Sequence, residues 1–316
     1  MNTLMNPGIS QTYEKLGSSG HAVLLIHGLS GSPFEVMYLA KKLNAAGYTV
    51  RVPLLPGHGE NVGRLSGKRW QAWYEEVSAH FEDLSGKYKT VSVAGLCMGA
   101  VLALHLAAEK GARVRALSVM ATTLFFDGWA LPWYKFLMPL ATHTPLKHFM
   151  SFKEREPFGV KNERLRERVA AGMKQDGSGI AYSKMPMTSV REMQKLVAAT
   201  KRRLHKIKTP TIILHAEEDD VASLRNADYL ERYLGAAKVR RVTLRDSYHL
   251  ITVDNDRDQV ARETVAFFVH QCFLAQTIEA PSPAQDAGQK TWKLRQFEAA
   301  PAQGKRHSAG GTMTAA

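Results

Sequence analysis

One of the two cysteines in this chain stands in a setting that suits a nucleophile. Cys97 is the centre of Gly-Leu-Cys-Met-Gly, between the apolar stretch TVSVA and the amphipathic stretch MGAVLALHLAAEK. A sharp strand-to-helix turn needs glycine on both sides, and it holds the central residue in a strained, exposed position. The positive end of the following helix favours a thiolate and a developing oxyanion. The pattern therefore predicts that Cys97 performs covalent catalysis.

A second loop, residues 26–33 with the sequence IHGLSGSP, also follows a predicted strand and precedes a predicted helix. Acyl transfer requires two N–H donors that converge on the position of the oxyanion. In a strand-turn-helix arrangement of this kind, one donor comes from such a loop and the other from the residue after the nucleophile. We therefore assign the oxyanion hole to the backbone amides of Leu29 and Met98.

The acid and the base are expected late in the chain, because nucleophile, acid and base follow in that order in this architecture. His249 lies in a loop directly before the C-terminal helix, which makes it the expected base. The acid is expected after the strand Thr211–His215, where residues 217–220 are four carboxylates in a row. From its register relative to the strand end, Asp219 is preferred to Asp220 as the partner that fixes the imidazole tautomer.

These residues need a scaffold that brings the ends of several strands together. Short apolar stretches alternate with longer amphipathic ones, which is typical of an α/β protein with a mostly parallel central sheet flanked by helices. The expected strands are Ala22–His27, Tyr48–Pro53, Thr90–Ala94, Val114–Met120, Thr211–His215 and Val239–Leu244. The expected helices are Pro33–Ala46, Lys68–Ser85, Met98–Lys110, Ser223–Leu234 and Asp256–Phe273.

This alternation breaks between residues 122 and 208. Aromatic and apolar residues fill the stretch from Leu124 to Leu137, and two helices are expected at Asn162–Lys174 and Ser189–Arg203. We interpret residues 122–208 as a helical lid inserted over the carboxyl edge of the sheet. The core then comprises residues 1–121 and 209–275. The segment 276–316, rich in Pro, Ala, Gly and Gln, is expected to be a disordered tail.

The chain carries a formal charge of +13, and about +10 of it lies in residues 122–208, where 17 Lys or Arg face 7 Asp or Glu. This basic segment could attract an anionic headgroup, coenzyme A phosphates or an anionic membrane surface, so peripheral contact with such a surface is one expectation. No nucleic-acid-binding motif accompanies the charge, and no nucleic acid partner is expected. Two cysteines, no leader pattern and no long apolar run predict reduced thiols in a cytoplasmic protein.

The motifs HGLSGSP, PLLPGHGEN, GLCMGA, ILHAEEDDV and DSYHLITVD resemble those of the α/β-hydrolase superfamily, specifically its small lidded carboxylesterases and monoacylglycerol lipases. They span about residues 22–272. The resemblance implies an α/β-hydrolase fold, hydrolysis of acyl esters, and neither cofactor nor metal. It also implies that Asp219 is the acid, three positions after Ala216, and that His58 supports the site. The branch normally has serine where this chain has Cys97.

The cysteine leaves three functions open. The first is a hydrolase of small-molecule acyl esters or thioesters that forms an acyl-enzyme through Cys97, His249 and Asp219. The second is an acyltransferase that moves an acyl group from a thioester such as acyl-CoA to an acceptor other than water. Dienelactone hydrolases and polyhydroxyalkanoate synthases are superfamily relatives with cysteine at this position. The third is a non-catalytic, hydrolase-like binding protein in which Cys97 is inert. Acyl chain length and oligomeric state are not predicted.

Overall fold

The computed structural model describes residues 11–59, 62–131, 142–153, 155–174, 184–236 and 238–279. The chain divides into two units, residues 1–275 and 276–316, and only residues 276–279 of the second are described. The fold and the site below concern the first unit.

A seven-stranded sheet forms the centre of this unit, in the strand order β1-β3-β2-β4-β5-β8-β9. Strand β1 (Tyr13–Lys15) is antiparallel to β3 (Thr49–Val52), and the other neighbouring strands are parallel. The remaining strands are β2 (His21–Ile26), β4 (Thr90–Leu96), β5 (Val114–Met120), β8 (Thr211–Ala216) and β9 (Val239–Leu244). All six expected strands are present. The additional strand β1 has the sequence YEK, which carries no hydrophobic pattern long enough to predict it.

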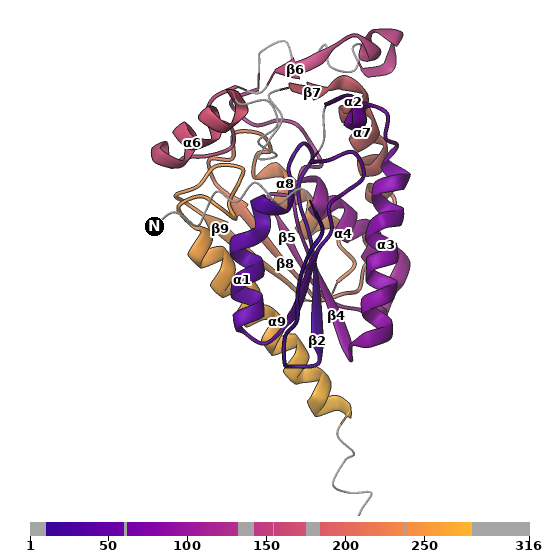
Figure 1. Cartoon of the computed structure of the whole chain (residues 1–316). Coiled ribbons are helices and arrows are strands. Elements are labelled where there is room, and N and C mark those ends of the chain that lie inside the picture. The colour runs from indigo at the N-terminus through magenta and orange to yellow at the C-terminus, as the bar shows by residue number, and fades with distance from the viewer. Residues whose placement is uncertain are drawn as a thin grey trace, which may run out of the picture. The chain divides into compact units, whose positions relative to one another are not determined.

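Helices cover both faces of the sheet (Figure 1). Helices α1 (Met37–Ala45) and α9 (Arg257–Glu279) lie on one side, and α3 (Trp70–Lys87) and α4 (Met98–Lys110) lie on the other. Each expected helix is present, including α8 (Arg225–Tyr233). The largest differences from the expected bounds are in α1 and α9. A separate 3-10 turn, Pro33–Val36, precedes α1, and α9 runs six residues past the expected end at Phe273.

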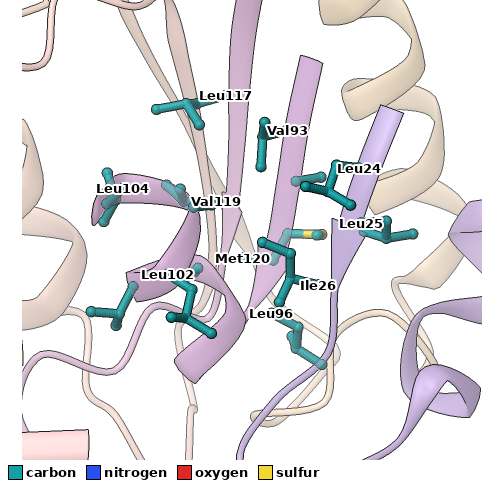
Figure 2. Close-up of a cluster of buried hydrophobic side chains, with 14 of the residues drawn as sticks. Leu24, Leu25, Ile26, Val93, Leu96, Leu102, Leu104, Leu117, Val119 and Met120 are labelled. Carbon is teal, nitrogen blue, oxygen red and sulfur yellow. The ribbon is translucent and has the colours of Figure 1, made fainter. Parts of the chain in front are cut away.

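The core around β4 and α4 fixes the turn that carries Cys97. Figure 2 shows buried side chains from β2, β4, β5 and α4 packed together, among them Ile26, Leu96, Leu102 and Val119. Helix α4 is buried over ten consecutive residues from Met98 to Ala107, so it lies inside the molecule instead of on its surface. Burial of each large aliphatic side chain contributes about 1.5–3 kcal/mol. The strand before Cys97 and the helix after it are therefore held rigidly.

The segment between β5 and β8 adds small elements beyond one end of the sheet (Figure 1). It contains η4 (Pro145–His148), β6 (Ser151–Lys153), α6 (Glu163–Lys174), β7 (Lys184–Pro186), α7 (Met187–Lys201) and η5 (Leu204–Lys206), with β6 antiparallel to β7. Helix α2 (Val62–Ser66) lies near β7 and α7. The two helices expected in this segment are present. Trp133 to Leu137 of the predicted aromatic stretch lie outside the described residues, and the bounds 122–208 stay a prediction.

A search of the described residues for a membrane-spanning segment finds no helix with the required length and apolar character.

Candidate active site

Cys97 occupies a strained turn between β4 and α4. Its backbone has φ 55° and ψ −116°, a combination that a residue with a side chain rarely adopts. The flanking glycines are required by space: a Cβ on Gly95 would lie 2.2 Å from the carbonyl oxygen of Gly99, and a Cβ on Gly99 would lie 2.3 Å from that of Ile26. The Cys97 N–H donates to the carbonyl of Met120 at the end of β5, 3.0 Å away. The predicted sharp turn between strand and helix, called the elbow from here on, is therefore present.

The Cys97 side chain lines a cavity of about 140 Å³ that His249 also lines. Cys97 is 9% exposed, and its Sγ lies 3.4 Å from the Thr123 hydroxyl oxygen. Apolar side chains from the inserted segment complete much of the wall, including Phe152 and Met187. The sulfur thus borders an open space that a small molecule can enter.

His249 and Asp219 form a buried pair. His249 Nδ1 lies 2.9 Å from Oδ2 of Asp219 and 3.0 Å from Oδ1. The backbone N–H groups of Val221 and Ala222 donate to the same Oδ1 at 2.9 and 2.7 Å, which fixes the carboxylate. Nε2 of His249 is buried and has no hydrogen-bond partner of regular geometry among the described residues. The imidazole is therefore held through Nδ1 while Nε2 remains available to the cavity.

The electrostatics favour a charged pair. Burial alone would lower the pKa of His249, but the charges of Asp219 and Cys97 outweigh it and hold that pKa well above its ordinary value. Burial would raise the pKa of Asp219, but the charge and hydrogen bond of His249 hold it below its ordinary value. Asp219 is consequently a carboxylate that stabilises an imidazolium.

Asp220, the alternative acid, does not meet the imidazole. Its Oδ1 accepts the backbone N–H of His249 at 3.2 Å, and its Oδ2 accepts the N–H of Gly159 at 3.1 Å. Burial is the main reason that its pKa is raised. The geometry thus distinguishes two neighbouring carboxylates, of which only Asp219 contacts the ring.

The two residues predicted to form the oxyanion hole, Leu29 and Met98, belong to segments that adjoin Cys97. Met98 is the first residue of α4, so its N–H has no acceptor within the helix. The loop that contains Leu29 lies against the elbow, since a Cβ on Gly28 would be 3.3 Å from the Cβ of Cys97. In the part of the chain that the structure describes, neither the Leu29 nor the Met98 N–H meets an acceptor. Their role as oxyanion donors stays a prediction.

Two imidazoles support the loop before Leu29. His27 Nδ1 donates to the carbonyl of Gly28 at 2.9 Å, and its Nε2 accepts the N–H of Leu55 at 3.2 Å. Burial lowers the pKa of His27 to about 4, so it stays neutral. His58 packs against His27 and Trp73, with ring centroids 5.0 and 5.9 Å away, and does not line the cavity.

Three nearby residues were not predicted to touch the site. Thr123 lies shortly after β5, whose end is beside the elbow. The adjacency of these two strand ends is the signal from which contact between Thr123 and Cys97 could be predicted. Glu35 lies under the Leu29 loop, where its Oε2 accepts the N–H of Gly28 at 3.0 Å. His215 has Nε2 3.4 Å from Oδ2 of Asp219 and 2.7 Å from the carbonyl of Ala222. No local motif marked Glu35.

Residues 17–256 match the family described as serine aminopeptidase, S33. The chain belongs to this family. The S33 description specifies a serine, whereas this S33 member carries Cys97 at the elbow.

Two relatives of this S33 chain are named as enzymes that act on esters. It is 28% identical over 262 residues to the thermostable monoacylglycerol lipase of Bacillus sp. (strain H-257), covering 83% of this chain and 94% of that one. It is 24% identical over 247 residues to a carboxylesterase of Bacillus subtilis (strain 168), covering 78% and 91%. A solved structure from work on LipS and LipT, two metagenome-derived lipolytic enzymes, matches with a TM-score of 0.70 at 22% identity, covering 82% and 97%, which shows the shared fold. The prediction of an α/β-hydrolase of the lipase-like branch is confirmed.

Proposed function

We propose that this protein hydrolyses small-molecule carboxylic esters or thioesters through a covalent acyl-enzyme on Cys97. The observation that carries the proposal is the pairing of a strained, cavity-lining cysteine with a histidine that Asp219 holds through Nδ1. The names monoacylglycerol lipase and carboxylesterase among the relatives support esters as the substrate class.

In the acylation step, the Cys97 sulfur attacks the carbonyl carbon of the ester and His249 Nε2 holds the thiol proton. The carbonyl π electrons move onto oxygen, where the Leu29 and Met98 amides stabilise the negative charge. The tetrahedral species then collapses, the bond to the alcohol breaks, and the leaving oxygen takes the proton from Nε2. The product of this step is a thioester on Cys97.

Deacylation repeats this sequence with water. His249 Nε2 removes a proton from water as the water oxygen attacks the thioester carbonyl, and the same two amides hold the oxyanion. The carbon–sulfur bond breaks, releasing a carboxylic acid and the Cys97 thiolate beside a protonated His249. Asp219 stabilises that imidazolium in both halves of the cycle.

The raised pKa of His249 suits a cysteine better than a serine. A serine must lose its proton during attack, so it requires a neutral imidazole in the free enzyme. A thiolate beside an imidazolium has already separated its proton, so a high histidine pKa stabilises the reactive form. Asp219 acts to raise the pKa of His249 and therefore favours a proton on the imidazole.

The cavity wall supports an apolar acyl group. Its side chains include Phe126, Phe152, Met185, Met187 and Met193, which offer apolar contact of adaptable shape. We propose that the acyl chain packs against these residues while the carbonyl lies between Cys97 and the two amides.

The proposal is tested by turnover of p-nitrophenyl butyrate and of butyryl-CoA with product analysis. Release of butyric acid by the wild-type chain, its loss in Cys97→Ala, and wild-type turnover in Cys272→Ala are expected. Cys272 is a matched control, because it is buried elsewhere, beside Tyr48 and Thr90. Transfer of the butyryl group to glycerol without release of butyric acid would show that the protein is an acyltransferase and not a hydrolase. Absence of turnover with both substrates would support the binding-protein alternative.

A further inference from the structure

Two buried carboxylates join the inserted segment to the loop that carries His249. Asp220 accepts one backbone N–H from each side: Gly159 of the insertion donates to Oδ2 at 3.1 Å, and His249 donates to Oδ1 at 3.2 Å. The Asp220 side chain is therefore a direct bridge between the insertion and the backbone of the histidine.

Asp254 makes a second bridge of the same kind. Its Oδ2 accepts the N–H of Lys161 at 2.7 Å and that of Tyr248 at 3.0 Å. Its Oδ1 accepts the N–H of Asn162 at 2.9 Å. Asp220 and Asp254 are each only 2% exposed, so water cannot replace a lost acceptor without rearrangement.

The backbones that the carboxylates join are also in direct contact. The N–H of Leu250 donates to the carbonyl of Gly159 at 2.8 Å. Gly159 has φ +73°, and a Cβ there would lie 3.2 Å from the Cβ of His249 and 3.1 Å from Cγ of Leu250. Glycine is required at this point because the insertion passes so closely over the histidine.

We propose that Asp220 and Asp254 are positioning residues that fix the backbone of His249 against the insertion, so that its imidazole reaches Cys97. This inference rests on the proposed function, in which His249 serves Cys97. A carboxylate that binds donors on two segments fixes the distance between them, and a misplacement of about 1 Å at a reacting group lowers a rate by about 100-fold. The part of the insertion at residues 158–162 is accordingly a fixed component of the site.

A purely structural role makes a different prediction. Residues that only stabilise the fold lower the melting temperature when replaced, but leave the chemistry of the folded protein unchanged. A positioning role lowers the rate constant of the reaction at Cys97 while the KM changes little, because the apolar side chains proposed to hold the acyl group are unchanged and asparagine keeps the shape of Asp220, which also lines the cavity.

The test uses Asp220→Asn and Asp254→Asn in the full chain. Asparagine keeps the shape but replaces one acceptor oxygen with an NH₂ group, so at least one bridging N–H loses its partner. Two rate constants are measured: alkylation of Cys97 by iodoacetamide, followed by peptide mass, and single-turnover acylation by p-nitrophenyl butyrate. We expect both rates to fall about tenfold or more in each variant, with KM within about twofold of wild type.

The matched control is Asp246→Asn. Asp246 lies in the same loop, but its side chain is 63% exposed and contacts the ammonium of Lys161 at 3.6 Å. It is expected to react at the wild-type rate. Gly159→Ala perturbs the bridge from the insertion side and keeps the test decisive if an aspartate variant fails to fold. We expect its alkylation and acylation rates to fall in the same way.

Wild-type rates of alkylation and acylation in the folded Asp220, Asp254 and Gly159 variants would overturn the positioning role. Failure of the proposed function has a different signature, in which the wild-type chain is alkylated at Cys97 but is not acylated. The alkylation rates still decide the positioning role in that case, since they depend on His249 and Cys97 and not on an ester substrate.

Discussion

Nδ1 of His249 lies 2.9 Å from Oδ2 of Asp219, and both side chains are buried. The carboxylate is fixed in turn by the backbone N–H groups of Val221 and Ala222. The imidazole is thereby held with Nε2 free for the cavity that Cys97 lines.

Asp219→Asn is expected to lower kcat/KM for an ester by about 10³–10⁴-fold, because an amide favours the wrong imidazole tautomer and removes the charge that stabilises the imidazolium. Steady-state kinetics with p-nitrophenyl butyrate measures the effect. Glu217→Gln changes an exposed carboxylate of the same loop and is expected to leave kcat/KM unchanged. A loss of less than about tenfold in Asp219→Asn would contradict the assigned role.

Cys97→Ser is expected to shift the ascending limb of the pH profile towards alkaline pH. Serine requires neutral His249, and the charge and hydrogen bond of Asp219 still act to raise the pKa of that imidazole when the contribution of Cys97 is removed. In the proposed mechanism the proton of the wild-type pair already lies on His249, so attack by Cys97 does not require a neutral imidazole. Measurement of kcat/KM between about pH 5.5 and 10 compares the two chains. Coincident ascending limbs would rule out the ion-pair description.

The same pair makes stability depend on pH. The pKa of His249 is raised in the folded state, so its stabilisation is complete below its unfolded pKa of about 6.5 and is lost as pH rises through the raised value. The pKa of Asp219 is lowered, so its stabilisation is present above about 3.8 and is lost as pH falls. The decrease in melting temperature from wild type to Asp219→Asn is therefore expected to be largest between about pH 4 and 6.5 and smaller at pH 9. An equal loss at all pH values would contradict this linkage.

Gly99→Ala is expected to destabilise the protein by about 1–3 kcal/mol, since its Cβ would overlap the carbonyl of Ile26 at 2.3 Å. Urea unfolding gives the difference in free energy. Gly67→Ala is the matched control, because a Cβ at that position meets nothing within 4 Å. Equal stability of the two variants would show that the elbow tolerates a side chain after Cys97.

Phe149 and Met150 are expected to contact an anionic lipid surface. They are 88% and 46% exposed, beside the basic residues Lys147 and Lys153. Phe149→Ser should therefore reduce co-sedimentation with phosphatidylglycerol vesicles, since it removes apolar area from the contact. Leu16→Ser, which changes a residue 71% exposed near β1, should not. Equal binding of both variants, or equal binding to neutral phosphatidylcholine vesicles, would argue against this surface.

The sequence predicts most of the sheet and the elbow because their signals are local. The buried strands β2, β5 and β8 are short and mainly apolar, and the two glycines around Cys97 reflect a steric requirement of the turn itself. His249 and Asp219 are predicted from the order of nucleophile, acid and base in this architecture and from the register of Asp219 after its strand. Loops after parallel strands meet at one edge of a sheet. Their contact in the structure therefore follows from the order of the strands.

The contacts that the sequence does not predict join residues far apart along the chain. Lys161 and Asp254 are 93 positions apart, and nothing near either residue indicates a shared hydrogen bond. Thr123 and Glu35 reach the site through the packing of loops, which carries no periodic signal. From the sequence, Asp220 is the alternative to Asp219 as the acid. Its proposed positioning role is indicated only by the structure, in which its carboxylate accepts two backbone N–H groups.

The most direct test of the account is the mass of the chain after rapid mixing with p-nitrophenyl butyrate and acid quenching, followed by peptide mapping. We predict one added butyryl group on the peptide that contains Cys97, which decays as butyric acid appears and is missing in Cys97→Ala. An unmodified Cys97 during turnover, or a butyryl group on another residue that persists in Cys97→Ala, would contradict the account.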